Sequence, residues 1–144
     1  MIAYCDGAAR GNPGPAGFGV HITDASGRTI HEIARGIGPA TNNVAEYSAL
    51  LAALEWASSE GVRELLVRSD SHLMVQQMNG AYKVKNANLQ KLHRRARELA
   101  SGIPRVSYEH VRREYNKEAD ALANRGVDEW LASGSPDVGP PSLF

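Results

Sequence analysis

Apolar residues fall in short runs along this chain, separated by polar and glycine-rich segments. The run at residues 2–5 and the weakly alternating stretches at 18–22 and 29–34 predict three successive strands. Four glycines and two prolines between Gly7 and Gly17 predict a turn, and Asp24–Gly27 predicts a second one. Because these connections are short, the three strands are expected to be antiparallel.

Helical spacing of apolar residues dominates the rest of the chain. The first helix is expected to begin at the capping residues Thr41 and Asn42 and to end at Gly61. Its apolar positions are Val44, Tyr47, Leu50, Leu51, Leu54 and Ala57. Further helices are predicted over residues 71–78, 86–100 and 117–131, and further strands over 65–67 and 106–111.

This order of elements predicts an α/β fold. A strand that follows a crossover helix pairs in parallel with its neighbour, so three antiparallel strands are followed by parallel ones. We therefore expect a five-stranded mixed sheet flanked by helices. The length of 144 residues indicates one domain, which we assign to residues 1–131. Residues 132–144 are rich in Gly, Pro and Ser and are predicted to form a flexible C-terminal tail.

Composition indicates in which compartment the protein is expected. The single cysteine, Cys5, excludes an internal disulfide, fits a reducing compartment and is expected to be a buried, inert thiol. No apolar stretch approaches the ~20 residues that span a bilayer, and the first residues lack a signal-peptide pattern. We expect a cytoplasmic monomer that does not contact membranes.

The charges balance overall but not locally. The formal net charge is zero, with 16 basic and 16 acidic residues, which argues against a non-specific nucleic-acid binder. The segment 83–97 nevertheless contains six basic residues and no acid. On charge alone, a solvated helix face and a phosphate-binding face are equally good interpretations of this segment.

Four carboxylates are the candidate chemical site. Asp6 and Asp70 follow predicted strands, and Glu46 and Asp120 each lie one turn into a predicted helix. Each has an ordinary alternative, since Asp70 can cap a helix and the two helical acids can face solvent. If the fold gathers all four, their mutual repulsion calls for hard divalent cations with oxygen ligands. Two Mg²⁺ ions about 4 Å apart are a known arrangement for in-line attack on a phosphodiester.

Several motifs resemble one family. The run DGAARGNPGPAGFG at Asp6–Gly19 is similar to the opening of ribonuclease H type 1, in its short bacterial or archaeal form. The other matches are TNNVAEY at Thr41–Tyr47, SDS at Ser69–Ser71, YKVKN at Tyr82–Asn86 and NKEADALA at Asn116–Ala123. They occur in order, with suitable gaps, from residue 2 to about residue 131, and are highly specific as a set.

The resemblance implies the ribonuclease H fold and endonucleolytic hydrolysis of the RNA strand of an RNA–DNA hybrid. It also implies Mg²⁺ or Mn²⁺ as the cofactor, and products with 5′-phosphate and 3′-hydroxyl ends. By position, Asp6, Glu46, Asp70 and Asp120 match the catalytic, metal-binding acids of the family. Glu46 is also expected to accept a 2′-hydroxyl, the group that distinguishes RNA from DNA.

The resemblance implies substrate contacts as well. The matching positions are Gly11 and Asn12 for the RNA strand, Asn43 and Asn86 near the minor groove, Thr41 and Asn42 for a DNA phosphate, and Tyr82 for a DNA sugar. Thr41 and Asn42 fit a helix N-terminus that offers free N–H groups. For the Asn and Thr residues, capping and turn chemistry is the alternative, and for Tyr82 it is core packing.

The chain departs from the family pattern in two places. The loop before Asp120 has no histidine, and Arg113 or Glu114 stands at the matching position as a candidate auxiliary residue. His110 is expected to be a satisfied histidine within a strand rather than a catalytic one. The segment after the short helix has no long basic protrusion, and no preceding hybrid-binding domain is expected, so hybrid binding is expected to rest on Lys83, Lys85 and the 91–97 face. Short members of the family can also act on double-stranded RNA, and the sequence leaves that activity open.

Three rival functions remain to be weighed. A DNA-directed nuclease of the same fold is disfavoured by the GNPGP and TNN segments. A non-catalytic nucleic-acid-binding module is disfavoured because all four acids are present. A nucleotide-binding protein ranks last, because neither GxxxxGK[ST] nor GxGxxG at a strand–helix turn occurs.

Overall fold

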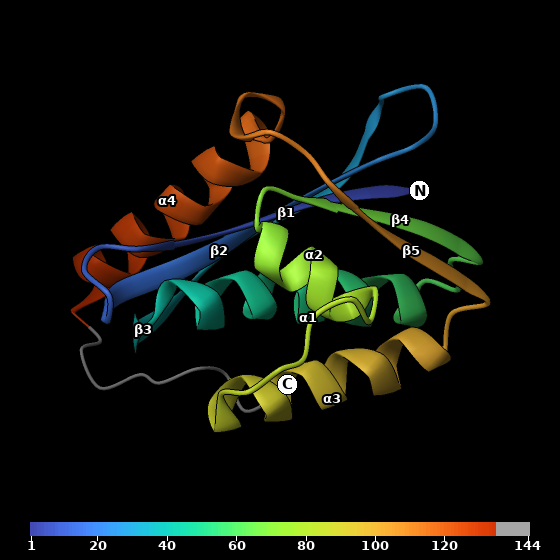
Figure 1. Cartoon of the computed structure of the whole chain (residues 1–144). Helices are drawn as coiled ribbons and strands as arrows, with labels where there is room; N and C mark the ends of the chain where they lie inside the picture. Colours follow the sequence, from blue (N-terminus) through green and yellow to red (C-terminus); the bar gives the residue numbers. More distant parts are fainter. Residues whose placement is uncertain (135–144) are drawn as a thin grey trace.

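The computed structural model describes residues 1–134 as a mixed sheet with helices on both faces (Figure 1). The strands are β1 (Ile2–Ala9), β2 (Gly14–Thr23), β3 (Thr29–Ala40), β4 (Glu64–Ser69) and β5 (Arg105–His110). The helices are α1 (Asn42–Ser59), α2 (His72–Met78), α3 (Ala87–Ser101) and α4 (Lys117–Ser133), and a short 3-10 helix, η1, spans Arg113–Tyr115.

The sheet has the strand order β3-β2-β1-β4-β5. Strands β1, β2 and β3 pair antiparallel, whereas β4 pairs in parallel with both β1 and β5. Figure 1 shows α4 on one face of the sheet, and α1 with α3 beyond it on the other. The predicted α/β class and five-stranded mixed sheet are confirmed.

The burial of α1 explains its sequence. The Thr41 side chain caps the helix by accepting a hydrogen bond of 3.3 Å from the Val44 N–H. The helix packs between the sheet and α3, so residues on nearly every side of it are buried, and no single apolar stripe can describe it. The outer helix α3 is one-sided instead, with Leu89 and Ala96 buried and the rest partly or fully exposed.

The first predicted turn is wrong in its extent. β1 continues through Gly7 to Ala9 and β2 begins at Gly14, so only residues 10–13 connect the two strands. Asp6 therefore lies inside β1, paired with Gly19, rather than at its end. Glycine was taken as a turn signal, but here Gly7 and Gly17 are strand residues against which a helix packs closely.

Other boundaries differ less. β3 extends to Ala40, six residues beyond the predicted strand end. Ala132 and Ser133, assigned to the tail from the sequence, are the last residues of α4. Gly134 is the C-cap of α4, and the remaining residues of the predicted tail, 135–144, lie outside the described residues. In the described part of the chain, no helix is long and apolar enough to cross a membrane.

Candidate metal centre and substrate cleft

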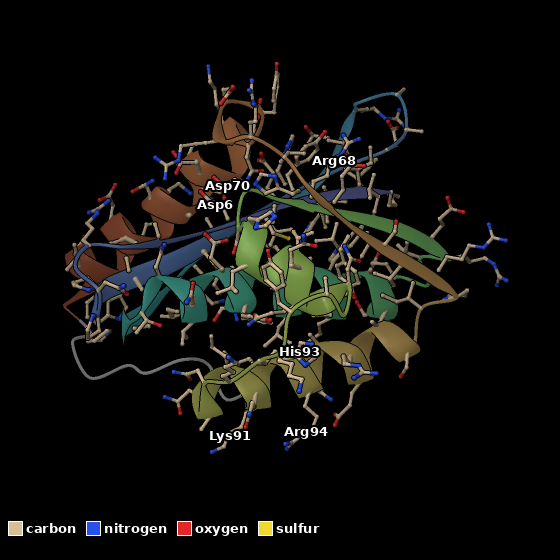
Figure 2. All side chains as sticks on the ribbon, viewed as in Figure 1. Asp6, Arg68, Asp70, Lys91, His93 and Arg94 are labelled. Carbon is tan, nitrogen blue, oxygen red and sulfur yellow. The ribbon has the colours of Figure 1, made fainter. Side chains whose placement is uncertain are left out.

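Three of the four acids form one tight group. Asp6, Glu46 and Asp70 each offer a carboxylate oxygen, and these oxygens lie within 4.8 Å of one another. Figure 2 shows Asp6 and Asp70 side by side at one end of the sheet. Because β1 and β4 are parallel neighbours, the end of β4 brings Asp70 alongside β1, and α1 supplies Glu46 from one side.

Close backbone packing brings the acids together. A Cβ built on Gly7 would lie 2.4 Å from the Glu46 nitrogen, so only glycine lets α1 approach β1 this closely. On the opposite face, a Cβ on Gly19 would lie 2.4 Å from the carbonyl oxygen of Ala119 in α4. Two glycines thus bring the helices that carry Glu46 and Asp120 close to the strands around Asp6.

Asp120 lies at the edge of the group. It is exposed in the first turn of α4, and its side chain is close enough to that of Asp6 to raise the pKa of Asp6. It lines the same cleft as the other three acids but is outside the set whose oxygens lie within 4.8 Å of one another. All four predicted acids therefore face one cleft, three of them as a compact cluster.

The ordinary alternatives for two of the acids are wrong. Ser71, not Asp70, caps α2, because its side chain accepts from the Met74 N–H at 3.3 Å. Asp70 is therefore not needed as a cap. Glu46 does not face solvent, because it is 5% exposed. One of its carboxylate oxygens, Oε2, is buried without a hydrogen-bond partner among the described residues.

Burial and the crowding of acids raise the pKa values of Asp6 and Glu46. Burial raises the pKa of Asp6, and the nearby charges of Glu46 and Asp70 raise it further. Burial and the charge of Asp70 raise the pKa of Glu46, partly offset by a hydrogen bond to the Gly7 backbone. Full ionisation of the cluster is therefore unfavourable unless a cation is present.

This donor set fits a hard divalent cation. All of its ligand atoms are carboxylate oxygens, the type that Mg²⁺ and Mn²⁺ prefer. The buried, unpartnered oxygen of Glu46 is what a bound cation would satisfy. The raised pKa values fit the same picture, because burial and the neighbouring carboxylates both disfavour the ionised form of these acids.

The cleft around the acids has a volume of about 800 Å³. Four of the predicted substrate residues line it, together with both candidate auxiliary residues, Arg113 and Glu114. The four are Gly11, Asn12, Asn42 and Asn43. Asn12 also accepts a hydrogen bond of 2.9 Å from the Asn42 N–H, and Thr41 engages Val44, so two donors at the start of α1 are already used.

The other five predicted substrate residues do not line this cleft. Tyr82 and Lys83 line a second groove, and Thr41, Lys85 and Asn86 line neither. Asn86 caps α3 by accepting from the N–H groups of Asn88 and Leu89. The capping alternative for Asn86 is therefore present in the structure, and contacts of these five residues with substrate stay predictions.

Two cleft residues were missed from the sequence. His110 is the last residue of β5, where it was expected, but it is exposed and lines the cleft rather than being a satisfied strand residue. Arg112 lines the cleft beside it. The parallel pairing of Ser69 with His110 is the signal that could have found it, since it places His110 at the same sheet end as Asp70.

The fold and the carboxylate cluster are typical of enzymes that use divalent cations on phosphate esters. A family model described as reverse transcriptase-like matches residues 4–126. A ribonuclease HI of Halobacterium salinarum is 46% identical over 127 residues, 88% of this chain and 64% of the relative. A bifunctional protein of Mycobacterium tuberculosis is 44% identical over 144 residues, 99% of this chain but 40% of the relative. The chain thus spans less than two thirds of these two relatives.

Solved structures agree with the sequence matches. RNase H1 from Halobacterium salinarum superposes with a TM-score of 0.86 at 45% identity, covering 89% of this chain and 97% of that one. LC11-RNase H1, solved in complex with an RNA/DNA hybrid, gives a TM-score of 0.86 at 46% identity, covering 90% and 98%. The chain belongs to the ribonuclease H family, and the resemblance seen in its motifs is confirmed.

Proposed function

We propose that this chain is an endoribonuclease that hydrolyses the RNA strand of RNA–DNA hybrids and leaves 5′-phosphate and 3′-hydroxyl ends. The observation that carries the proposal is the group of Asp6, Glu46 and Asp70 oxygens within 4.8 Å of one another in an open cleft. A relative at 46% identity was crystallised with such a hybrid, which supports this choice of substrate.

We propose Asp6, Glu46, Asp70 and Asp120 as the catalytic residues and as ligands for two Mg²⁺ ions, with Mn²⁺ as a substitute. When bound, such ions lower the pKa of water and stabilise charge on the leaving oxygen. The donor chemistry and the unpartnered oxygen of Glu46 support divalent binding in general. The choice of Mg²⁺ rests on the family resemblance alone.

The chain's own side chains have proposed roles around the acids. Asn12 and Asn43 line the cleft and present amide groups that can bond base edges and 2′-hydroxyls. Gly11 lacks a side chain at the cleft wall, so a sugar–phosphate backbone can approach the main chain there. For Arg113 we propose a contact with an incoming phosphate, which is supported by its 88% exposed side chain and by the 3.9 Å between its Nε and Asp70 Oδ2.

Several finer properties belong to the same proposal. We infer a cytoplasmic monomer that does not act at membranes, a catalytic domain over residues 1–131 and a side activity on double-stranded RNA. The buried, reduced state of Cys5 is compatible with a reducing compartment. Each of these rests on the sequence, and the assay below includes duplex RNA.

The test is cleavage of an end-labelled RNA–DNA hybrid with Mg²⁺. Asp70→Asn keeps the side-chain shape but removes a charge, and is expected to lower the rate about 100-fold or more. Glu118→Gln is the matched control, since it removes an exposed charge near Asp120 and is expected to cut at the wild-type rate. Equal rates for both variants would overturn the proposal.

The same assay separates the rival functions. Cutting of duplex DNA in preference to hybrid would favour the DNA-directed nuclease. Hybrid binding without cutting, and without stabilisation by Mg²⁺, would favour a non-catalytic binding module. Cutting of hybrid with slower cutting of duplex RNA is the outcome we expect.

A further inference from the structure

A second groove, separate from the acidic cleft, lies between the end of α2, the segment 79–84 and α3. Its volume is about 930 Å³. Three cationic side chains line it, Lys83, Arg94 and Arg97, together with Tyr82 and His93. Figure 2 shows His93 directed from α3 toward the rest of the domain, and Arg94 directed outward. Lys85 and Lys91, which belong to the same basic stretch of sequence, do not line the groove.

The groove carries positive charge that the protein does not neutralise. No Asp or Glu occurs between Asp70 and Glu98. In residues 1–134, none of the three groove cations forms an ion pair, whereas every ion pair there uses an arginine from another position. Glu98 lines the groove too, but its Oε2 is 3.4 Å from Arg95 Nη1. On a chain of zero net charge, this uncompensated patch calls for an anion.

Hydrogen bonds hold the groove in shape. Buried Gln77 lies at the centre of these bonds, because its Oε1 accepts from the Tyr47 hydroxyl at 2.6 Å and its Nε2 donates to the Lys83 carbonyl at 3.5 Å. The His93 ring lies 3.2 Å from the Gln77 carbonyl, and Gln90 donates to the Val84 carbonyl at 2.9 Å. The segment around residue 83 is thus tied to both helices, so binding an anion requires little reordering.

A row of rings joins this groove to the acidic cleft. Tyr82 lines the groove and is 46% exposed, and its ring centroid is 5.9 Å from that of His72. The His72 ring is in turn 5.4 Å from that of His110, which lines the cleft. A polynucleotide that leaves the cleft along this row can place sugars or bases on rings and then phosphates beside the cations.

We propose that this groove binds the phosphate backbone of the hybrid beyond the segment held at the acids, with Arg94 and Arg97 as its phosphate contacts. The proposal rests on the proposed function and extends its binding surface to the face of α3. Nucleic acid is the occupant because its repeating phosphates match several unpaired cations, and because the rings of Tyr82, His72 and His110 connect the groove to the cleft. The 83–97 segment is then a phosphate-binding face rather than a merely solvated one.

The test measures binding of a hybrid of two helical turns, about 20 base pairs, as a function of salt. The protein carries Asp70→Asn in every case, so that the hybrid stays intact. The groove variant adds Arg94→Ala and Arg97→Ala, which change exposed helix positions to a good helix former. The control adds Arg63→Ala and Arg125→Ala, which remove the same charge from exposed positions that line neither cavity.

Each lost phosphate contact lowers the salt slope by about 0.9, so two contacts make the fall in affinity between about 50 and 200 mM salt about 12-fold smaller. We expect this change in the groove variant but not in the control, with partial recovery in Arg94→Lys/Arg97→Lys. Equal slopes in groove variant and control, with both folded by thermal melting, would overturn the inference alone. If the wild-type chain neither binds nor cuts hybrid, the proposed function fails first and the inference with it.

Discussion

Asn116 Nδ2 donates a hydrogen bond of 2.9 Å to the main-chain oxygen of Cys5. The bond joins residues 111 positions apart and is fully buried, with Asn116 1% exposed. Cys5 directly precedes Asp6, and Asn116 accepts from the Asp120 N–H at 3.0 Å through its own carbonyl. This one side chain therefore fixes the start of α4 to the strand that carries the central acid.

We predict that Asn116→Ala destabilises the fold by about 1–3 kcal/mol, because a buried carbonyl loses its donor. Cleavage is also expected to fall, since Asp120 loses its anchor relative to Asp6. Asn79→Ala is the matched control: Asn79 Nδ2 donates to the Tyr108 carbonyl at 3.2 Å, but at an exposed site where water can replace it. Chemical unfolding measures both, and an Asn116→Ala variant no less stable than Asn79→Ala would contradict the prediction.

Gly7 gives a second test of how the acids are assembled. A Cβ at this position would lie 2.4 Å from the Ala45 carbonyl carbon and the Glu46 nitrogen, so Gly7→Ala must push α1 away from β1. We expect a loss of about 1–3 kcal/mol from overpacking, and a larger relative loss of activity as Glu46 moves from Asp6. Gly102→Ala is the control, because its Cβ meets nothing nearer than 3.4 Å. Wild-type metal affinity in Gly7→Ala would argue against the link to Glu46.

The strand glycines also show what the sequence could and could not predict. The order of strands and helices followed from periodicity, and the motif resemblance identified the family correctly. The glycines misled, because Gly7 and Gly17 were taken as turn residues although both lie in strands. Glycine signals both a turn and a close helix–strand approach, and a single sequence does not distinguish them.

The candidate site was predicted unevenly for a related reason. The acids were found because they follow strands or stand near helix starts. The burial of Glu46 was missed because α1 is covered on nearly all sides, which its apolar spacing does not reveal. Tyr82 and Lys83 were assigned to the substrate by motif, yet the structure separates them from the cleft as the wall of another groove. Their position depends on tertiary hydrogen bonds through Gln77, which no local pattern encodes.

The raised pKa values of Asp6 and Glu46 give the metal-free protein an unusual pH dependence. The ordinary pKa values are 3.8 for Asp6 and 4.5 for Glu46. In the folded protein both pKa values are higher, so each carboxyl keeps its proton to a higher pH than in the unfolded chain. Above those values the unfolded chain releases protons that the folded chain retains, so stability falls as pH rises through the folded pKa. We expect the melting temperature without divalent ions to fall between about pH 5 and pH 8.

Removal of one acid tests the cause of that fall. Asp6→Asn is expected to flatten the pH dependence and to raise the melting temperature of the metal-free protein at the upper end of the range. Added Mg²⁺ is expected to stabilise the wild type by binding only the folded state, and to stabilise Asp6→Asn less. Asp128→Asn, at an exposed position, is the control for loss of a charge. Stability that rises with pH in EDTA would show that the acid cluster does not dominate.

His110 tests whether every cleft residue is needed for chemistry. Among the described residues it forms no hydrogen bond with the acids, and its ring packs edge-on against that of His72. We predict that His110→Ala retains most of the turnover, whereas Arg113→Ala, which removes the guanidinium nearest Asp70, lowers it several-fold. Arg112→Ala is the control for charge, since Arg112 pairs with Glu114 at 3.5 Å. Turnover at saturating hybrid and Mg²⁺ measures all three, and a His110→Ala loss as large as that of Asp6→Asn would make His110 a catalytic residue.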